Sequence, residues 1–520
     1  MKSENRYFLS LPRNICFVVI IILGFATIVA CGGGGGGNSS GTAPVITDLN
    51  MMAISHSSLA VSLTFQDADG DVSAISHSIY DESSLLVKGS NDVTGASGIT
   101  NGSLSGEFNF SNVELGDYSI DFYFTDKKGN DSNIKSGYFE IEGGFGTASI
   151  YPDENNGIYL GTTAIGDLNG DGLNDVAAIQ LDWPTNYDNG PLSIYYQTAS
   201  SGLLGNPQTI DPAILIRDVA IGDINNDNKD DLITAGLSGN IQDGYSAQII
   251  IMRLDPESGQ LGSQQEYTLN LESVEKIAVG DLNGDGRNDL AVSAFYGIAL
   301  FFQNDDGTLC PEVDIKTSTY LFDDIYIADM NNDGRNDLIT RSGGKEVSII
   351  KQLPSGEFNT IPDVYSSSEI PSDFCFAVAD LNGDNKTDLA MFDNDHMAYY
   401  DTHNIYIFLQ NSQGTLDGPD VYATYPGYYV AQISDITKDG LNDIILVESG
   451  QLKVLRQTND HTFSNNESAG YSFSSSGSYD DQHLSIGDVT GDGLLDAVVT
   501  CKNQGLHVIP YGNNIILPSE

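Results

Sequence analysis

A ten-residue segment recurs seven times in this chain of 520 residues, and its copies begin 56, 58, 48, 51, 55 and 53 residues apart. Positions 1, 5 and 9 are Asp in every copy, position 3 is Asn or Thr, and position 6 is Gly or Asn. Regular copies at this spacing restrict the fold to an array of one supersecondary unit, as in solenoids and propellers. The copies occupy residues 167–176, 223–232, 281–290, 329–338, 380–389, 435–444 and 488–497.

Each copy lies among short apolar segments that are typical of strands. In the third copy, one such segment precedes the loop at 274–280, and others follow at 289–294 and 298–304. A Gly-x-Phe or Gly-x-Leu turn then leads to a weaker fourth segment, as at 356–365. Short runs rich in Val, Ile, Tyr and Phe and bounded by Gly, Asn and Asp predict strands. Four antiparallel strands per copy predict one blade, and therefore an all-β, seven-bladed β-propeller over residues 144–520.

The two ends of this region predict that the ring closes. The seventh copy is followed by one more strand segment at 506–512 and then by little chain. Residues 144–152, before the first copy, form a strand segment with no partner in their own repeat. We predict that this segment is the fourth strand of the last blade, because that pairing removes the exposed edge of an open array.

The loop chemistry predicts a metal ion. Alternate positions of a tight loop turn their side chains toward one centre, where three carboxylates repel one another unless a cation lies between them. Oxygen ligands favour Ca²⁺, which takes about 6–8 of them, over Mg²⁺, which requires a stricter octahedron. We predict up to seven Ca²⁺, each completed by the carbonyl at position 7 and a bidentate Asp at position 9. Thr437 and Thr490 at position 3 predict the weakest sites, because a hydroxyl is a poorer ligand than an amide carbonyl.

The predicted ligands are Asp167, Asn169, Asp171, Asp175, Asp223, Asn225, Asp227, Asp231, Asp281, Asn283, Asp285, Asp289, Asp329, Asn331, Asp333, Asp337, Asp380, Asn382, Asp384, Asp388, Asp435, Asp439, Asp443, Asp488, Asp492 and Asp496.

Two other kinds of loop share part of this pattern. An EF-hand is excluded, because it needs flanking helices and an acidic residue at position 12, which here is apolar or Thr and lies in a strand segment. A turn held by side-chain to backbone hydrogen bonds without metal stays open. Position 6 fits a sharp loop in either case: it needs a positive φ, and Asn228 and Asn385 replace Gly with the residue that best tolerates it.

With these loops, the repeat resembles the FG-GAP/VCBS repeat of integrin-α-like β-propellers over residues 144–520. The resemblance implies Ca²⁺ loops between the first and second strands of the blades. It also implies binding of other molecules rather than catalysis, although some polysaccharide lyases have related blades. In contrast to integrins, no insertion resembles an added ligand-binding domain.

The N-terminal residues are typical of an export signal. An apolar run at 15–30 follows a basic start and is short for a transmembrane helix, which needs about 20 residues. Residues 28–31, Ile-Val-Ala-Cys, resemble a bacterial lipobox. We predict a signal peptide at 1–30 and lipidation of Cys31, with an uncleaved single-span anchor as the alternative. By the same resemblance, the Gly after Cys31 predicts the outer membrane of a bacterial cell envelope.

Two segments separate this signal from the repeats. Residues 31–43 are rich in Gly and predict a flexible tether. Residues 44–143 alternate apolar and polar positions and predict an immunoglobulin-like β-sandwich. Within it, Asp67, Asp69 and Asp71 have the alternate spacing of Ca²⁺ ligands, but a turn without metal explains them equally well.

The net charge of the chain and the aromatic residues of its long loops restrict the classes of molecule that it can bind. The chain has 22 Lys and Arg against 72 Asp and Glu, a net charge of −50, which excludes nucleic acid and leaves the lipid anchor as the only membrane contact. Aromatic residues in the long loops opposite the metal loops suit a glycan or a protein surface, unless they only pack those loops down. The predicted ligand-binding residues are Trp183, Tyr187, Tyr399, Tyr400, His403 and Tyr428.

The sequence therefore predicts a cell-surface protein that binds an extracellular glycan or protein without catalysis. It has no Gly-x-Ser-x-Gly, phosphate-loop or His-Glu-x-x-His motif. Two alternatives stay open: a polysaccharide-degrading lyase that uses His396, Asp401 and His403, and a purely structural envelope protein. The cysteines of the repeats, Cys310, Cys375 and Cys501, are expected to be free and to pack as small apolar side chains.

Overall fold

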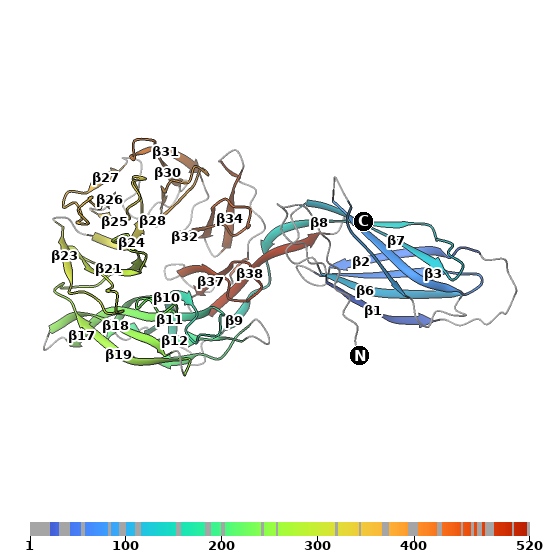
Figure 1. Ribbon diagram of the computed structural model, residues 1–520, viewed down its shortest axis with the longest axis horizontal. Helices are drawn as coiled ribbons and strands as arrows, with labels where there is room; N and C mark the ends of the chain where they lie inside the picture. Colours follow the sequence, from blue (N-terminus) through green and yellow to red (C-terminus); the bar gives the residue numbers. More distant parts are fainter. Residues whose placement is uncertain are drawn as a thin grey trace. The chain divides into compact units, whose positions relative to one another are not determined.

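The computed structural model divides into two compact units, one of Met1–Gly146 with Gly512–Glu520 and one of Thr147–Tyr511 (Figure 1). The described residues are 21–30, 42–53, 58–81, 85–92, 100–109, 116–151, 158–182, 189–198, 203–240, 244–255, 258–317, 321–342, 345–366, 374–393, 404–423, 429–448, 451–458, 462–464, 471–473, 483–501 and 504–516. Among them, no helix is long and apolar enough to cross a membrane.

Two antiparallel sheets make up the first unit, with strand orders β1-β6-β3-β2 and β5-β4-β7-β8. Alternate residues of both sheets meet in one apolar core: Leu59 and Leu63 point inward from β3, and Ile120 and Phe122 do so from β7. The strands are β1 (Ile21–Ala30), β2 (Val45–Ala53), β3 (Ser58–Gln66), β4 (Val72–Tyr80), β5 (Leu85–Asp92), β6 (Asn101–Asn109), β7 (Gly116–Asp126) and β8 (Lys135–Phe145).

Strand β1 differs from the sequence-based expectation. Its residues fall in the predicted signal peptide, yet they pair antiparallel with β6, from Ile21 opposite Asn109 to Ala30 opposite Gly102. A run rich in β-branched residues suits a strand, and the edge of β6 offers it unpaired backbone groups. The structure is that of the uncleaved chain. Cleavage before Cys31, which lies outside the described residues, stays a prediction.

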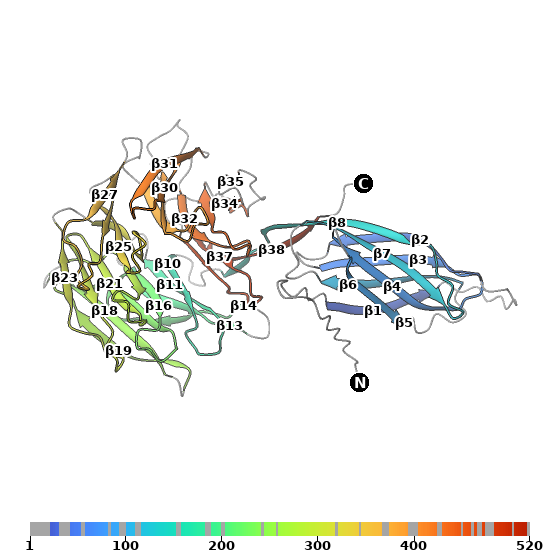
Figure 2. The ribbon, with the colours of Figure 1, turned by 45° about the horizontal axis from the view of Figure 1, so that its top comes forward.

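The second unit consists of four-stranded antiparallel meanders, as a β-propeller requires (Figures 1 and 2). Within the described residues, each of the first six repeats forms one such sheet, and the seventh contributes β36, β37 and β38. The ten-residue loop of each repeat joins the first and second strands of its sheet. A separate two-stranded sheet pairs β13 (Gln197–Thr198) with β14 (Leu203–Leu204).

The sheets, in chain order, consist of the following strands: β10 (Ile158–Gly166), β11 (Asp175–Asp182), β12 (Asn189–Tyr195) and β15 (Gln208–Ile210); β16 (Leu215–Gly222), β17 (Asp231–Asn240), β18 (Gly244–Asp255) and β19 (Gln260–Thr268); β20 (Ile277–Gly280), β21 (Asp289–Ala294), β22 (Gly297–Phe301) and β23 (Val313–Lys316); β24 (Leu321–Ala328), β25 (Asp337–Ser342), β26 (Glu346–Ile350) and β27 (Asp363–Ser366); β28 (Phe374–Ala379), β29 (Asp388–Asp393), β30 (Asn404–Gln410) and β31 (Leu416–Ala423); β32 (Tyr429–Ser434), β33 (Asp443–Glu448), β34 (Gln451–Gln457) and β35 (Phe463–Ser464); β36 (His483–Gly487), β37 (Asp496–Cys501) and β38 (Gly505–Ile516).

Successive sheets pack face to face. Strands β21, β25, β29 and β37, each the second of its sheet, are buried along their whole length. One apolar cluster, for example, joins Ile249 and Ile251 of β18 to Leu290 and Val292 of β21. A second strand covered on both faces explains why each of these segments has apolar residues directly after its first Asp, and why polar residues such as Thr340 and Arg341 of β25 are buried as well. Among the described residues, Cys310, Cys375 and Cys501 of this unit form no disulfide.

The first strands contact one another in a closed cycle. Strand β10 contacts β16, each later first strand contacts the next, and β36 contacts β10 again. Strand β9 (Ser149–Tyr151) pairs antiparallel with β38, with Tyr151 opposite Leu506, which confirms the predicted pairing with the last sheet for residues 149–151. Residues 144 and 145, which the prediction included, instead end β8 in the first unit. The hydroxyls of Thr163 and Ser485, 2.7 Å apart, also join the first sheet to the last.

A buried histidine makes the first unit sensitive to acid. His77 is fully buried in β4, and neither ring nitrogen has a hydrogen-bond partner among the described residues. Its ring packs edge-on against Phe108 at a centroid distance of 5.3 Å. Burial lowers the pKa of His77 from 6.5 to about 4, so the unfolded chain binds more protons than the folded one between those pH values.

We therefore predict that the free energy of unfolding falls as the pH drops from 6.5 towards 4, and that His77→Leu removes this part of the fall. The part assigned to His77 amounts to about 3 kcal/mol at the acid end. Urea unfolding at pH 7.5, 6 and 4.5 measures it for both proteins. Equal losses between pH 7.5 and 4.5 in the two proteins would contradict the prediction.

Candidate metal centres

The seven loops share one backbone geometry that is organised by the Asp at position 1. In the third loop, Asp281 Oδ1 accepts hydrogen bonds from the backbone N–H of Asn283, Gly284 and Asp285 at 2.6–3.2 Å. In all seven loops, Oδ2 of this Asp accepts the N–H of position 6 at 2.7–2.9 Å. The carboxylate therefore fixes the turn before any ion is bound.

Position 6 has a positive φ in every copy, as the sequence predicts. The five glycines have φ between 79° and 87°, and Asn228 and Asn385 both have φ 61°. Position 4 also has a positive φ in every copy, which sequence reasoning missed. Gly or Asn stands there in six copies, but Lys438 adopts φ 62° in the sixth loop. Lys is a poor residue for this region, so the sixth loop carries backbone strain.

The Asp at position 9 is buried in all seven loops, with 0% exposure. In the third loop, Asp289 Oδ2 accepts the N–H of Leu282 at 2.8 Å, and Oδ1 accepts the N–H of Gln303, just after the third strand, at 2.8 Å. Five other copies repeat the bond to Oδ1 from the corresponding residue. Burial raises the pKa of this group, to about 6 in Asp289 and to about 7 in Asp175.

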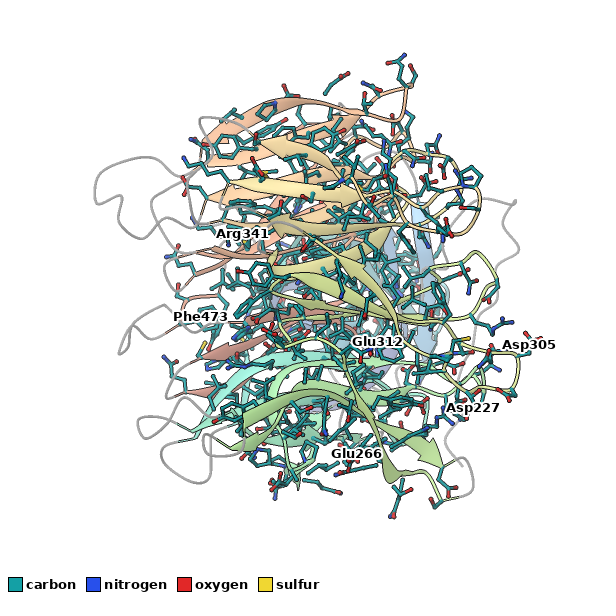
Figure 3. All side chains as sticks on the ribbon, turned by 90° about the vertical axis from the view of Figure 1, so that its left-hand side faces the viewer. Asp227, Glu266, Asp305, Glu312, Arg341 and Phe473 are labelled. Carbon is teal, nitrogen blue, oxygen red and sulfur yellow. The ribbon has the colours of Figure 1, made fainter. Side chains whose placement is uncertain are left out.

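The Asp at position 5 is exposed at the tip of each loop. Figure 3 shows Asp227, the position-5 residue of the second loop, on the side of the unit away from Arg341 and Phe473. In three loops, this carboxylate forms an ion pair with the basic residue at position 7, as Asp285 does with Arg287. These pairs hold the position-5 carboxylate at the loop surface.

The carboxylates at positions 1, 5 and 9 of these loops do not converge on one point, which the predicted metal site requires. Within the described residues, the only set of three acidic side chains with one oxygen each within 4.8 Å of the others is Asp67, Asp69 and Asp71 in the first unit. In the repeats, position 9 instead turns inward to bind backbone N–H groups, and position 5 turns outward. The observed hydrogen bonds are those of the turn that the sequence left open as an alternative.

The donor set nevertheless fits a hard cation. Positions 1, 3 and 5 present carboxylate, amide and hydroxyl oxygens, and Oδ2 of the position-1 Asp, which accepts one N–H in the third loop, retains a second lone pair. The seventh loop has a further feature. Asp496 Oδ1 and Thr490 Oγ1 are buried there and have no hydrogen-bond partner within the described part of the chain. Such orphaned oxygens are the groups that a bound cation satisfies.

Sequence reasoning missed the side chain that links one loop to its neighbour. Asn at position 8 donates from Nδ2 to the backbone carbonyl of position 1 in the preceding sheet. Asn336 reaches Asp281 O at 2.7 Å, and three other copies repeat the bond, including Asn174 to Asp488 O across the closure of the ring. The recurrence of Asn at position 8 in these four copies was the available signal.

The predicted ligand-binding residues, Trp183, Tyr187, Tyr399, Tyr400, His403 and Tyr428, lie outside the described residues. The same is true of Cys31 and of the lyase candidates His396 and Asp401.

Comparison with known proteins gives the repeat a family. Residues 167–234, 281–340, 329–391 and 435–499 match the model of the FG-GAP-like repeat. This chain contains FG-GAP-like repeats. None of the curated proteins matches it.

Several solved structures resemble the FG-GAP-like chain at low identity. They include BBS1N in complex with ARL6DN, with 13% identity over 72% of this chain and 97% of that one and a TM-score of 0.46. A mutant of the NanB sialidase from Streptococcus pneumoniae has 10% identity over 88% and 83%, with a TM-score of 0.35. The soluble aldose sugar dehydrogenase from Escherichia coli has 10% identity over 70% and 99%, with a TM-score of 0.36. These likenesses assign no function to the chain.

Position 6 offers a test of the backbone geometry of the loop, because a side chain placed there would not collide with neighbouring residues. Gly286 has φ 82°, and a Cβ placed there meets no atom within 4 Å. We predict that Gly286→Asn is tolerated and that Gly286→Val lowers the free energy of unfolding by about 1–3 kcal/mol, because a β-branched residue is strained at positive φ. Urea unfolding in chelator compares the two variants. Equal stability of the Val and Asn variants would contradict the assigned backbone geometry.

Proposed function

We propose that this protein is a calcium-binding, seven-bladed β-propeller that displays a binding face for a glycan or a protein outside the bacterial inner membrane. Residues 1–30 are its signal peptide, Cys31 carries the lipid, and residues 31–43 form a tether. An immunoglobulin-like sandwich over 44–143 precedes the propeller, which spans 144–520. The protein catalyses no reaction and resides in the outer membrane through its lipid alone.

The cycle of contacts among the first strands supports seven blades. It contains β10, β16, β20, β24, β28, β32 and β36, one from each repeat, and β9 supplies the fourth strand of the last sheet. Two sheets that share one apolar core support the sandwich.

The observation that carries the calcium proposal is the geometry common to all seven loops. In each one, the position-1 carboxylate is fixed by the N–H of position 6, and the position-5 carboxylate is exposed beside it. The side chains at positions 1, 3 and 5 would hold the ion, and Ca²⁺ would supply positive charge to an acidic loop. Removal of residues 1–30 leaves a net charge of −52, and seven Ca²⁺ reduce it to −38. Bound calcium therefore relieves the self-repulsion of the chain.

Exposed aromatic side chains support a binding face at the opposite end of the sheets. Phe295 and Tyr296, in the turn between β21 and β22, are 41% and 52% exposed, and Tyr245, at the start of β18, is 43% exposed. These turns join second to third strands, so an antiparallel meander brings them to the face away from the metal loops. The two sheets are neighbours in the cycle, since β16 contacts β20. Aromatic platforms stack on sugar rings and anchor protein interfaces.

Removal of calcium tests the metal proposal. We predict that a chelator lowers the melting temperature of residues 31–520, because an ion that binds only the folded state stabilises it by mass action. Extracellular calcium sites bind at about 10⁻⁴–10⁻³ M, so the comparison uses ~10 mM calcium and should give about 1–3 kcal/mol per site. Calorimetry with atomic absorption measures both quantities. An unchanged melt together with no bound calcium would refute the proposal.

A binding panel tests the function. Residues 31–520 are presented to polysaccharides and surface proteins, with calcium and with chelator, and every bound polysaccharide is examined for cleavage. We expect binding without cleavage, and a reduction of at least about tenfold in Tyr296→Ser, as expected for loss of an aromatic anchor. Ile361→Ser is the matched control, because Ile361 is 75% exposed but lies outside this face, near the outer strand β27.

Two outcomes of the panel would replace the proposal. Cleavage of a bound polysaccharide would favour the lyase alternative and direct attention to His396, Asp401 and His403. Absence of binding to every member would favour a structural role in the envelope, in which calcium serves stability alone.

A further inference from the structure

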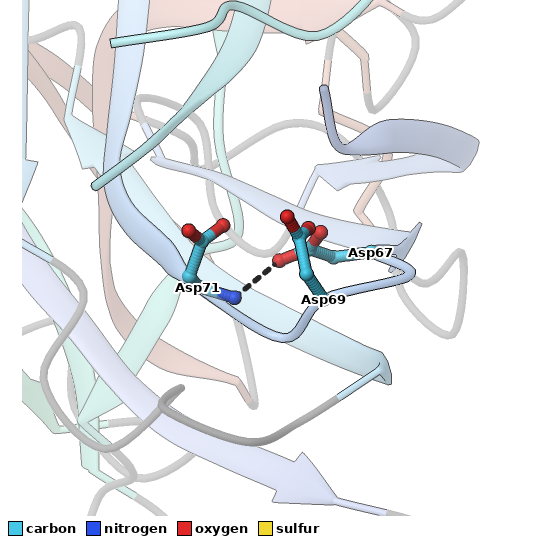
Figure 4. Close-up of side chains that lie close together, drawn as sticks. All are labelled: Asp67, Asp69 and Asp71. Carbon is cyan, nitrogen blue, oxygen red and sulfur yellow. Dashed lines mark hydrogen bonds between the residues drawn. The ribbon is translucent and has the colours of Figure 1, made fainter. Parts of the chain in front are cut away.

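The turn between β3 and β4 gathers three carboxylates at one end of the first unit. Asp67, Asp69 and Asp71 occupy alternate positions, and one oxygen of each lies within 4.8 Å of the others. Figure 4 shows the three carboxylates turned to the same side of the turn. Like charges this close repel strongly away from bulk water, so the arrangement needs positive charge or a proton.

One of the two carboxylate oxygens of Asp67 has no hydrogen-bond partner among the described residues. The residue is only 1% exposed, and its Oδ2 accepts the N–H of Asp71 at 2.6 Å and of Val72 at 3.0 Å. Its Oδ1 is buried, and no donor reaches it within the described chain. The same holds for Asp71 Oδ1. A buried carboxylate oxygen with no donor is unfavourable, and a cation between these carboxylates would satisfy both oxygens.

The positive charge already present is insufficient. Lys128, in the turn between β7 and β8, places Nζ 3.1 Å from Asp69 Oδ2 and 3.6 Å from Asp71 Oδ2. Its side chain is 49% exposed, whereas those of Asp69 and Asp71 are 8% and 17% exposed. With all three carboxylates ionised, one ammonium group leaves two negative charges. A divalent cation balances them with Lys128 in place.

We propose that Asp67, Asp69 and Asp71 bind one hard divalent cation, in a site separate from the FG-GAP-like loops. The ligands of the ion are the orphaned oxygens of Asp67 and Asp71 and one carboxylate oxygen of Asp69. Water completes the coordination, as is usual for such ions. The ion holds the β3–β4 turn closed, while Lys128 ties the same carboxylates to the β7–β8 turn. The proposal concerns the first unit alone and does not depend on calcium in the repeats.

Calcium stoichiometry tests the site in the full-length protein. Equilibrium dialysis at millimolar calcium compares the wild type with Asp71→Asn, which is nearly isosteric and retains the N–H that Asp67 accepts. We expect the variant to bind one ion fewer per chain. Asp131→Asn is the matched control: it removes the same charge from the exposed Asp131 nearby, whose Oδ1 accepts only from Thr125, and should keep the wild-type number.

A second measurement locates the ion without any substitution, in case the variant fails to fold. Crystals of the wild type soaked in strontium should give an anomalous peak among the three carboxylates. Equal stoichiometry in wild type and a folded Asp71→Asn, or no strontium peak at this turn, would overturn the inference. A wild type that binds one calcium and an Asp71→Asn variant that binds none would uphold this site while refuting calcium in the repeats.

Discussion

The buried carboxylate at position 9 is the interaction on which the architecture of each repeat depends. Asp289 stands at the first residue of the second strand, accepts one N–H from its own loop and accepts another from the end of the third strand. One side chain thus links the loop, the second strand and the end of the third strand. The dehydration that raises its pKa to about 6 is offset by these two bonds, which a water-exposed Asp would not make as strongly.

Carboxylates in the first unit are satisfied in two different ways. Asp126 is buried like Asp67, but its oxygens accept the backbone N–H groups of Lys128 and Asn130 and the side-chain amide of Asn130. Asp67 has two such donors on one oxygen and none on the other within the described residues. Both turns have similar Asp- and Gly-containing sequences. The turn at Asp126 supplies donors to both carboxylate oxygens, whereas the turn at Asp67 leaves one oxygen for a cation.

Much of the fold follows from local sequence pattern. Strand β21 has the predicted bounds, and the positive φ of Asn228 and Asn385 follows from the substitution pattern at position 6. The pairing of β9 with the last sheet followed from counting segments. The orientation of position 9 did not, because spacing alone does not separate an Asp that binds a metal from one that binds backbone N–H. The positive φ of Lys438 and the pairing of β1 also escaped prediction, since neighbouring backbone decides them against residue preference.

The pairing of β9 has a mechanical consequence. Strand β9 is the first strand of the second unit, so a force that pulls on the chain directly before it loads this strand first. Only Ser149, Ile150 and Tyr151 are paired with β38 in the described register, whereas β17 and β18 share nine paired residues within one sheet. Release of β9 therefore breaks fewer inter-strand pairs than separation of β17 from β18. Under tension on the preceding chain, we expect β9 to detach before the long interior hairpins open.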